Sequence, residues 1–369
     1  MEKIRAVRAT NQRNLRLLRR RPDLLAQSVL VPIVMLLLSA LIFGAGGDDW
    51  PVGVTDHAKS EQSAALVDAI EESSSTITPY FRTIETDATE AKEMLDEGRM
   101  QLVVEIPPDF DRTRQVDITT YNINSDATKN LRLRVEDALN AFDAKAGNLG
   151  VTVDLRTVEP EDIPRSEFIA GGLTLLALFF GAALIAANLF AVEQEQRTTK
   201  ELLLTPVGAG TAALSCMLTG TAVAFLTTVP TYVTGWLAFG LTPDPSALLQ
   251  VLLFMTPLML ACAGTGVLLA QLLRHHRSIQ PLLILVAIAT FFSAGGFVSV
   301  PGLPPEARAF ADWWPLSRIF EWNNPVLHHF ADNFPAQQWA WALAVAVLGA
   351  LAALWAARKE RYAAHSAGQ

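Results

Sequence analysis

The sequence of 369 residues has little charge and almost no cysteine. Charged residues make up 18% of the chain and hydrophobic residues 51%, whereas ordinary soluble domains are about 25% charged. The two cysteines, Cys216 and Cys262, both lie in apolar runs, so no disulfide framework is indicated. This composition excludes a disordered chain and a disulfide-built secreted module, and it argues against a fully soluble protein.

The motifs of common active sites are also absent. None of the seven lysines follows a glycine, so the sequence has no Gly-x-x-x-x-Gly-Lys-Ser/Thr phosphate-binding loop and cannot hydrolyse ATP by that route. The patterns Gly-x-Ser-x-Gly, His-Glu-x-x-His and Cys-x-x-Cys are missing as well. The pair His275 and His276 stands in a short basic loop, which favours a solvated segment over a metal site. We therefore expect no enzyme active site, no metal site and no cofactor in this chain.

The few charges are unevenly distributed. Residues 45–167 hold 26 acidic and 12 basic residues, whereas the remainder holds 11 acidic and 17 basic residues. Such a split is typical of a membrane protein that carries a soluble domain.

Six apolar runs are long enough to cross a bilayer, which takes about 20 residues of helix. None contains Asp, Glu, Lys, Arg or His, whose cost at the bilayer centre is about 2.5–3.5 kcal/mol each. The runs are Leu24–Phe43, Phe168–Val192, Ala213–Phe239, Leu248–Leu273, Pro281–Val300 and Trp339–Ala357. We expect a membrane α-helical protein with six transmembrane helices and an inserted extracellular α/β domain.

The short loops predict the orientation. Fifteen Lys and Arg residues flank the runs on the side of the two termini, against Arg308 and Arg318 on the opposite side. The positive-inside rule then places both termini in the cytoplasm of a multi-pass cell-membrane protein. The expected order is a cytoplasmic amphipathic elbow (1–23), a first span (24–44), the extracellular α/β domain (45–167), a second span (168–192), a polar cytoplasmic segment (193–211), three further spans (212–300), an extracellular loop (301–337), a sixth span (338–357) and a cytoplasmic tail (358–369).

Two of these regions have further internal pattern. The extracellular loop is rich in Pro and Trp, which fits a re-entrant or interfacial helical hairpin and, equally, a loop lying on the headgroups. The insert alternates between periods of about 2 and about 3.6 residues, which predicts a small α/β fold. Strands are expected at Pro51–Thr55, Tyr80–Ile84, Leu102–Ile106, Val116–Tyr121 and Val151–Val158, and helices at Ser60–Glu72, Ala88–Glu97 and Thr128–Lys145.

The polar residues at membrane depth are neutral. Ion-coupled transporters place ionisable groups inside the membrane, so their absence from the six runs indicates that any transport takes its energy from elsewhere. Asn188, Thr227 and Thr231 are candidates for lining a pathway. The alternative, which we favour for most such residues, is hydrogen bonding between helices.

The segment 193–211 is the dense polar stretch of the apolar half. Glu195 and Thr199 lie four residues apart, as do Arg197 and Glu201, so each pair shares a helical face. Leucines follow, and Thr205-Pro206 breaks the helix. The pattern fits a docking peg for a cytoplasmic partner and, equally, an ordinary interfacial loop.

This segment resembles the cytoplasmic bend of ABC-2 type exporter permeases. The similarity rests on Glu195-Gln-Arg197-Thr198-Thr199-Lys-Glu201-Leu-Leu-Leu-Thr205-Pro206-Val207, with Thr198 standing where the family usually has glycine. It extends to the elbow-like stretch Asn14–Asp23, and to Gly53–Asp56 and Val104–Phe110, which are similar to the branch of the family with a large extracellular domain between helices one and two.

The resemblance implies a permease subunit of an ATP-driven exporter. Two permease chains, alike or different, would pair in the lipid bilayer, and each would dock a separate ABC ATPase subunit that carries the ATP and Mg²⁺. The residues that would couple to that subunit are Glu193, Glu195, Arg197, Thr199, Glu201, Leu203 and Pro206. The cargo would be a drug, a lipid or another amphiphile, and no nucleic acid is involved.

Two other functions are compatible with the sequence. One is a membrane-anchored protein whose outer domain binds or senses a ligand, although such a sensor normally needs a cytoplasmic output domain. The other is a secondary transporter, which internal inverted repeats would favour; no such repeat is evident in this sequence.

Overall fold

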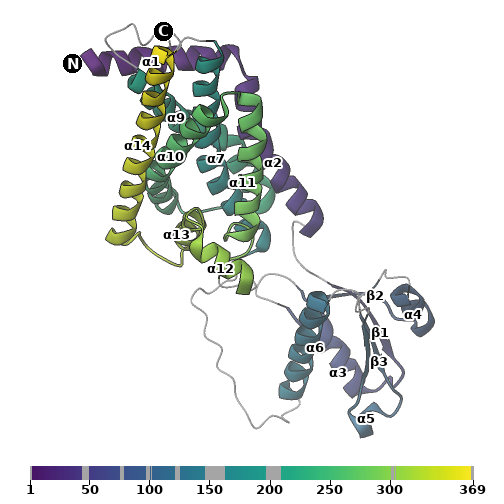
Figure 1. Ribbon diagram of the computed structural model, residues 1–369. Coiled ribbons are helices and arrows are strands. Elements are labelled where there is room, and N and C mark those ends of the chain that lie inside the picture. The colour runs from purple at the N-terminus through teal and green to yellow at the C-terminus, as the bar shows by residue number, and fades with distance from the viewer. Residues whose placement is uncertain are drawn as a thin grey trace. The chain divides into compact units, whose positions relative to one another are not determined.

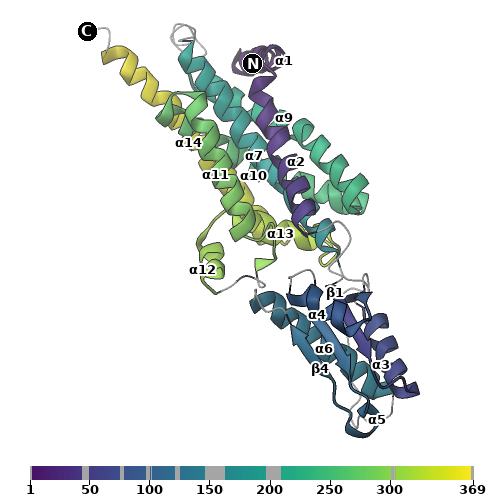
Figure 2. The same ribbon diagram turned by 90° about the vertical axis from the view of Figure 1, so that its right-hand side faces the viewer.

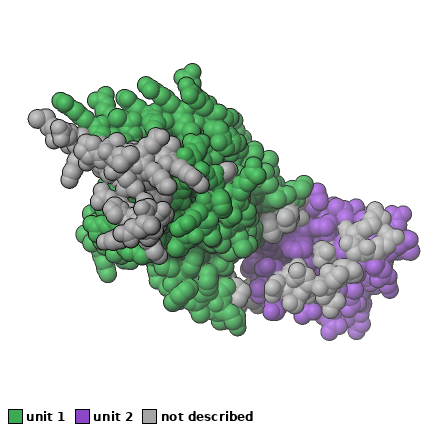
Figure 3. All heavy atoms as spheres, turned by 45° about the horizontal axis from the view of Figure 1, so that its top comes forward, with its two compact units in different colours: residues 1–45, 165–369 green, residues 46–164 purple. Residues whose placement is uncertain are grey.

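The computed structural model describes residues 2–43, 50–74, 79–96, 100, 102–120, 125–145, 163–196, 209–300, 303 and 305–366. The chain divides into two compact units, one of residues 1–45 with 165–369 and one of residues 46–164 (Figure 3). Each unit has its own hydrophobic core, so each is described by itself.

The first unit is a helical bundle. Its helices are α1 (Glu2–Arg20), α2 (Asp23–Phe43), α7 (Arg165–Glu195), α9 (Ala209–Phe239), α10 (Pro245–Leu273), α11 (His276–Ser293), α12 (Pro305–Trp313), α13 (Ser317–Leu327) and α14 (Ala336–Ser366). Helix α1 lies across one end of the bundle, where α14 also ends, and α12 and α13 lie at the opposite end (Figures 1 and 2).

Five helices among the described residues are long and apolar enough to cross a membrane. These spans are Asp23–Leu41, Arg165–Glu195, Gly210–Phe239, Pro245–Leu273 and Ala336–Arg358. They make the chain a multi-pass membrane protein with a mostly helical fold.

The expected fifth span, Pro281–Val300, differs in the structure. Helix α11 starts earlier, at His276, and ends at Ser293, and its apolar stretch of Arg277–Ser293 is shorter than the other five spans. The helix stops there because Gly295 adopts a φ of 100°, a left-handed conformation that continues no helix. The following loop contains two short helices, α12 and α13.

Helix α7 is the centre of the bundle. Every residue from Ile169 to Glu193 is buried, and α7 packs against α2, α9, α10, α11 and α13. Its sequence is apolar on all faces, as expected for a helix enclosed on every side. Five neighbouring helices therefore rest on one rod of 31 residues, about 46 Å long at 1.5 Å per residue.

Small residues let the helices approach closely. A Cβ on Gly264 of α10 would lie 2.2 Å from the carbonyl oxygen of Gly349 in α14, and one on Gly266 would lie 2.2 Å from the carbonyl oxygen of Ala183 in α7. Apolar surface drives little association in lipid, so such close packing stabilises the bundle instead.

The second unit is a small α/β fold. Its elements are β1 (Trp50–Asp56), α3 (Glu61–Glu72), β2 (Phe81–Glu85), α4 (Ala88–Asp96), β3 (Leu102–Ile106), α5 (Phe110–Thr113), β4 (Asp117–Thr120) and α6 (Ser125–Lys145). The sheet order is β2-β1-β3-β4, with β1 parallel to β2 and β3, and β4 antiparallel to β3. The expected strand at 151–158 lies outside the described residues, and the one-turn helix α5 was not expected.

The two faces of the sheet follow the alternation of the strands. Leu102 and Val104 of β3 belong to a core that includes Leu66 of α3 and Leu131 of α6. Val103 points the other way, into a smaller core with residues of α4. The β3 sequence Leu-Val-Val-Glu-Ile is therefore apolar on both faces because helices cover both.

Asp56 organises the turn after β1. Its Oδ1 accepts hydrogen bonds from the backbone N–H groups of Ala58 and Lys59 at 2.9 and 3.0 Å, and its Oδ2 accepts one from Ser63 Oγ at 2.7 Å. Partial burial acts to raise the pKa of Asp56, but the bonds from Ser63, Lys59 and Ala58 together hold it below its ordinary value of 3.8. The carboxylate thus fixes the start of α3, where Ser60 and Ser63 form a capping box.

We expect the substitution Gly264→Ala to destabilise the bundle by about 1–3 kcal/mol, because the new methyl group meets backbone that cannot move aside. The measurement is the apparent melting temperature of the full chain in nanodiscs. Gly181→Ala in α7 is the matched control, since its Cβ would meet nothing closer than 3.4 Å. Equal melting temperatures for Gly264→Ala and the wild type would contradict the packing argument.

We expect Asp56→Asn to weaken the α/β unit at neutral pH by about 1 kcal/mol through the lost charge-assisted hydrogen bonds. A lowered folded-state pKa stabilises the fold above pH 3.8, and this stability is lost as the pH falls through the lowered pKa. Hydrogen exchange of residues 50–72, corrected for intrinsic rates, should show this acid-dependent loss in the wild type and in Asp68→Asn, an exposed control on α3, but not in Asp56→Asn. The same acid dependence in all three proteins would rule out this role.

Candidate functional site

The C-terminal end of α7 is where the apolar rod becomes polar. Asn188, Glu193, Gln194 and Glu195 lie within its last eight residues, and each contacts a different part of the bundle. We call these four residues and their partners the α7 collar. The collar directly precedes residues 197–208, in which most of the predicted coupling residues lie.

Glu193 forms an ion pair with Arg13 of α1. The Glu193 side chain is 5% exposed, whereas Arg13 remains 43% exposed. A carboxylate this buried needs a charged partner, because an unpaired one carries a large desolvation penalty. Glu193 therefore fastens α1 to α7 and presents almost no surface to another protein.

Further polar contacts attach α1 to α9. Thr219 Oγ1 of α9 donates to Asn11 Oδ1 at 3.3 Å, and Ser215 Oγ donates to the carbonyl oxygen of Val7 at 3.2 Å. Asn14 is 1% exposed and donates to Cys216 Sγ at 3.8 Å. The buried face of α1 is thus polar at several places, although the helix lies on an apolar bundle.

Asn188 joins three helices. Its Nδ2 donates to the carbonyl oxygen of Leu24 in α2 at 3.0 Å, and its Oδ1 accepts from Gln280 Nε2 of α11 at 3.3 Å. Gln280 Oε1 in turn accepts from Gln27 Nε2 of α2 at 3.1 Å. Six residues after Asn188 in α7, Gln194 Nε2 donates a separate hydrogen bond to Gln271 Oε1 of α10. This amide chain fixes α2, α10 and α11 to the same end of α7.

Glu195 lies at the more exposed margin of the collar. Its Oε1 is 3.6 Å from Nδ1 of His275, in the turn between α10 and α11. The carboxylate also contributes to the raised pKa of Arg21, which comes mainly from the hydrogen bond and charge of Asp23. Glu195 therefore stands among basic groups, with its side chain 27% exposed.

The other predicted coupling residues, Arg197, Thr199, Glu201, Leu203 and Pro206, lie outside the described residues. Their role stays a prediction. The structure adds Arg13, Gln27, Gln271 and Gln280, which the sequence pattern did not single out. Arg13 and Glu193 are 180 residues apart, and a local motif carries no sign of such a pairing.

The predicted pathway residues are all enclosed within the chain. Asn188 and Thr231 are fully buried and Thr227 is 7% exposed. Thr227 Oγ1 donates to the carbonyl oxygen of Ala224 at 3.3 Å, whereas the Thr231 hydroxyl has no hydrogen-bond partner among the described residues. Asn188 thus makes the bonds between helices that the alternative interpretation expects, whereas the Thr227 bond lies within α9. A pathway role for the three is untested.

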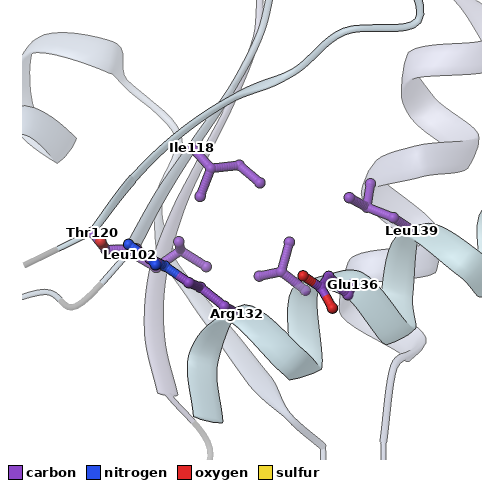
Figure 4. Close-up of a pocket in the computed structure, with 7 residues that line it drawn as sticks. Leu102, Ile118, Thr120, Arg132, Glu136 and Leu139 are labelled. Atoms are coloured by element: carbon purple, nitrogen blue, oxygen red, sulfur yellow. The ribbon is translucent and has the colours of Figure 1, made fainter. Parts of the chain in front are cut away.

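The α/β unit contains a pocket of about 240 Å³ between α6 and the β3–β4 edge (Figure 4). Its walls are apolar, and Arg132, Glu136 and Thr120 add polar groups. The lining residues are Leu102, Ile118, Thr120, Arg132, Val135, Glu136 and Leu139. Among the described residues of the whole chain, no group of three or more His, Cys, Asp or Glu side chains is placed to hold a metal ion.

The family model described as "ABC-2 family transporter protein" matches residues 23–359. The chain belongs to the ABC-2 transporter family. It is therefore a membrane permease subunit of a transporter, and membership implies an assembly with an ATPase partner. No curated protein and no solved structure matches the chain. In this ABC-2 permease, the collar directly precedes residues 197–208 in the sequence. The resemblance implied that this segment contacts the ATPase partner.

We expect Arg13 and Glu193 to be energetically coupled. Removing either partner alone by substitution to Ala leaves the other charge without its counter-ion, so the double variant should be more stable than the sum of the single effects by about 1–3 kcal/mol. Melting temperatures in nanodiscs for the two single variants and the double variant measure this coupling. Arg16→Ala, an exposed arginine one turn further along α1, should change stability little. Strictly additive effects would show that the ion pair does not hold α1.

Proposed function

We infer that this ABC-2 permease is the membrane subunit of an ATP-driven exporter, powered by a separate ATPase subunit that docks on the segment 193–211 through residues other than the buried Glu193. The observation that carries the proposal is the α7 collar. A displacement of the bend next to Gln196 reaches α1, α2, α10 and α11 through bonds to α7 itself.

The mechanical argument depends on stiffness. Helix α7 is continuous over 31 residues and has no proline in its interior, so a force at one end moves the whole rod. The neighbouring helices move with α7 at the collar, because breaking a buried hydrogen bond of a side-chain amide there leaves polar groups unsatisfied. Each unsatisfied group costs about 1–3 kcal/mol. Closure of the ATPase subunits would therefore tilt the bundle as a set, and nucleotide would bias two conformations by its differential affinity for them.

The energy source fits the same proposal. The sequence contains no phosphate-binding loop, so ATP and Mg²⁺ belong to the partner subunit. The buried polar side chains of α9 are neutral hydroxyls such as Thr227 and Thr231. The six apolar runs of the sequence contain no Asp, Glu, Lys, Arg or His, so they provide no ion-coupling site within their length.

The proposed assembly completes the membrane topology. Helix α11 is the sixth crossing, since 18 residues span about 27 Å and a hydrocarbon core is about 30 Å thick. Both termini and the collar then face the cytoplasm, and the α/β unit with the α12–α13 loop faces outside. Two permease chains pair, and the cargo is a drug, a lipid or another amphiphile.

We expect Arg197→Glu to lower the amount of ATPase subunit that co-purifies with a tagged permease several-fold, because it reverses the charge at position 197 of the docking segment. The measurement is a pull-down from native membranes in mild detergent, with melting temperature as a check on folding. Arg358→Glu is the matched control, an exposed charge reversal near the end of α14. Full co-purification and ATP-dependent export with Arg197→Glu would sink the docking assignment, and the absence of any ATPase after cross-linking would sink the exporter proposal.

A further inference from the structure

His328 occupies an enclosed position at the end of the bundle opposite the collar. It follows α13 directly, and its side chain is 2% exposed. The imidazole stacks on Phe168 of α7, with ring centroids 5.8 Å apart and an interplanar angle of 21°. Its Nε2 would lie 3.0 Å from a Cβ on Gly171, so the glycine provides the room that the ring occupies.

Neither imidazole nitrogen has a hydrogen-bond partner among the described residues. Buried polar groups are nearly always bonded, and a buried group left without a partner costs about 1–3 kcal/mol. Packing alone gives no reason to keep histidine here, since a leucine or phenylalanine would fill an apolar site without that cost. The side chain is therefore better explained by a function that uses its nitrogens.

The first turn of α7 supplies a charge opposite the ring. Glu167 Oε1 lies 3.8 Å from His328 Nδ1, and the Glu167 side chain is 18% exposed. This separation is too long for a hydrogen bond. It is short enough for a strong Coulomb attraction once the ring is charged, because water is largely excluded.

The other charges around the ring are few. On α7, Arg165 is exposed two residues before Glu167, and α10, which also packs against α13, has no charged residue. On α13 itself, Arg318 and Glu321 pair with each other. His329 and Asp332 follow in the exposed chain. Glu167 is thus the acidic group placed against the imidazole.

We propose that His328 is a proton-binding site in which proton uptake pairs the imidazolium with Glu167 and tightens α13 onto the first turn of α7. A proton from solvent adds to one ring nitrogen, both nitrogens become donors, and the net charge of the pair changes from −1 to 0. Histidine is suited to this role because it changes charge between about pH 5 and 8. No other co-reactant is needed.

The position of the site on α7 defines its consequence. The collar fixes the C-terminal end of α7, and the His328–Glu167 pair fixes its N-terminal end. A proton would therefore restrict how the central helix tilts. This inference goes beyond the proposed export function, and its test does not depend on that function.

The test is the melting temperature of the full chain in nanodiscs at about pH 5.5 and about pH 8, near the two ends of the range in which histidine changes charge. In the proposal the imidazolium meets Glu167 only in the folded chain, so the wild type should gain stability over the variants as the pH falls. We expect the advantage of the wild type over His328→Gln to be about 2–4 °C larger at the lower pH, as a difference near 1 kcal/mol gives for a unit of this size.

Two further variants make the test specific. Glu167→Gln keeps the imidazole but removes its partner, and it should lose the same pH-dependent gain; it also tests the proposal by itself if His328→Gln fails to fold. His329→Asn, at the exposed neighbouring histidine with a φ of 66°, should keep the wild-type response. Equal pH responses of the wild type, His328→Gln and Glu167→Gln, or an advantage that grows towards pH 8, would overturn the proposal.

Discussion

The structure depends on the complete enclosure of α7. In lipid, a helix gains little from burying apolar side chains against other apolar side chains, so close contact must hold the bundle together. Alanine, glycine and leucine make up most of the buried part of α7. Gly266 of α10 packs closely against the backbone carbonyl of Ala183. Because α2, α9, α10, α11 and α13 all rest on this one helix, its position determines theirs.

Apolar packing alone does not determine how far a helix slides along its axis. Directional bonds provide that information, and this bundle places them at the C-terminal end of α7. The amide chain through Asn188 and the ion pair of Glu193 stand there, whereas Glu167 faces His328 at the other end without a hydrogen bond. A slip of one turn, about 5.4 Å, would separate the bonded pairs and leave buried polar groups without partners. The polar collar thus specifies the register that the apolar middle does not.

The apolar runs predicted most of the bundle because charge-free stretches of this length have few alternatives to a membrane helix. The exception is instructive. Hydropathy continues through Pro281–Val300, but the backbone at Gly295 turns away and α11 ends at Ser293. In the α/β unit, alternation located β1 and β3 well, since both strands contribute to the cores between helices and sheet. The one-turn helix α5 was too short to produce a periodic signal.

The candidate site was predictable only in part, and the reason is physical. Glu193 stands out in the sequence as the first charge after an apolar run, and this position suggested contact with a partner. The structure shows that its side chain is buried against Arg13, so its direct contact is with α1. Sequence position alone cannot distinguish a charge that faces a second protein from one that pairs within the chain. Such a pairing makes the charge part of the rod on which the partner would push, and it passes that push to α1 and, through the collar, to the rest of the bundle.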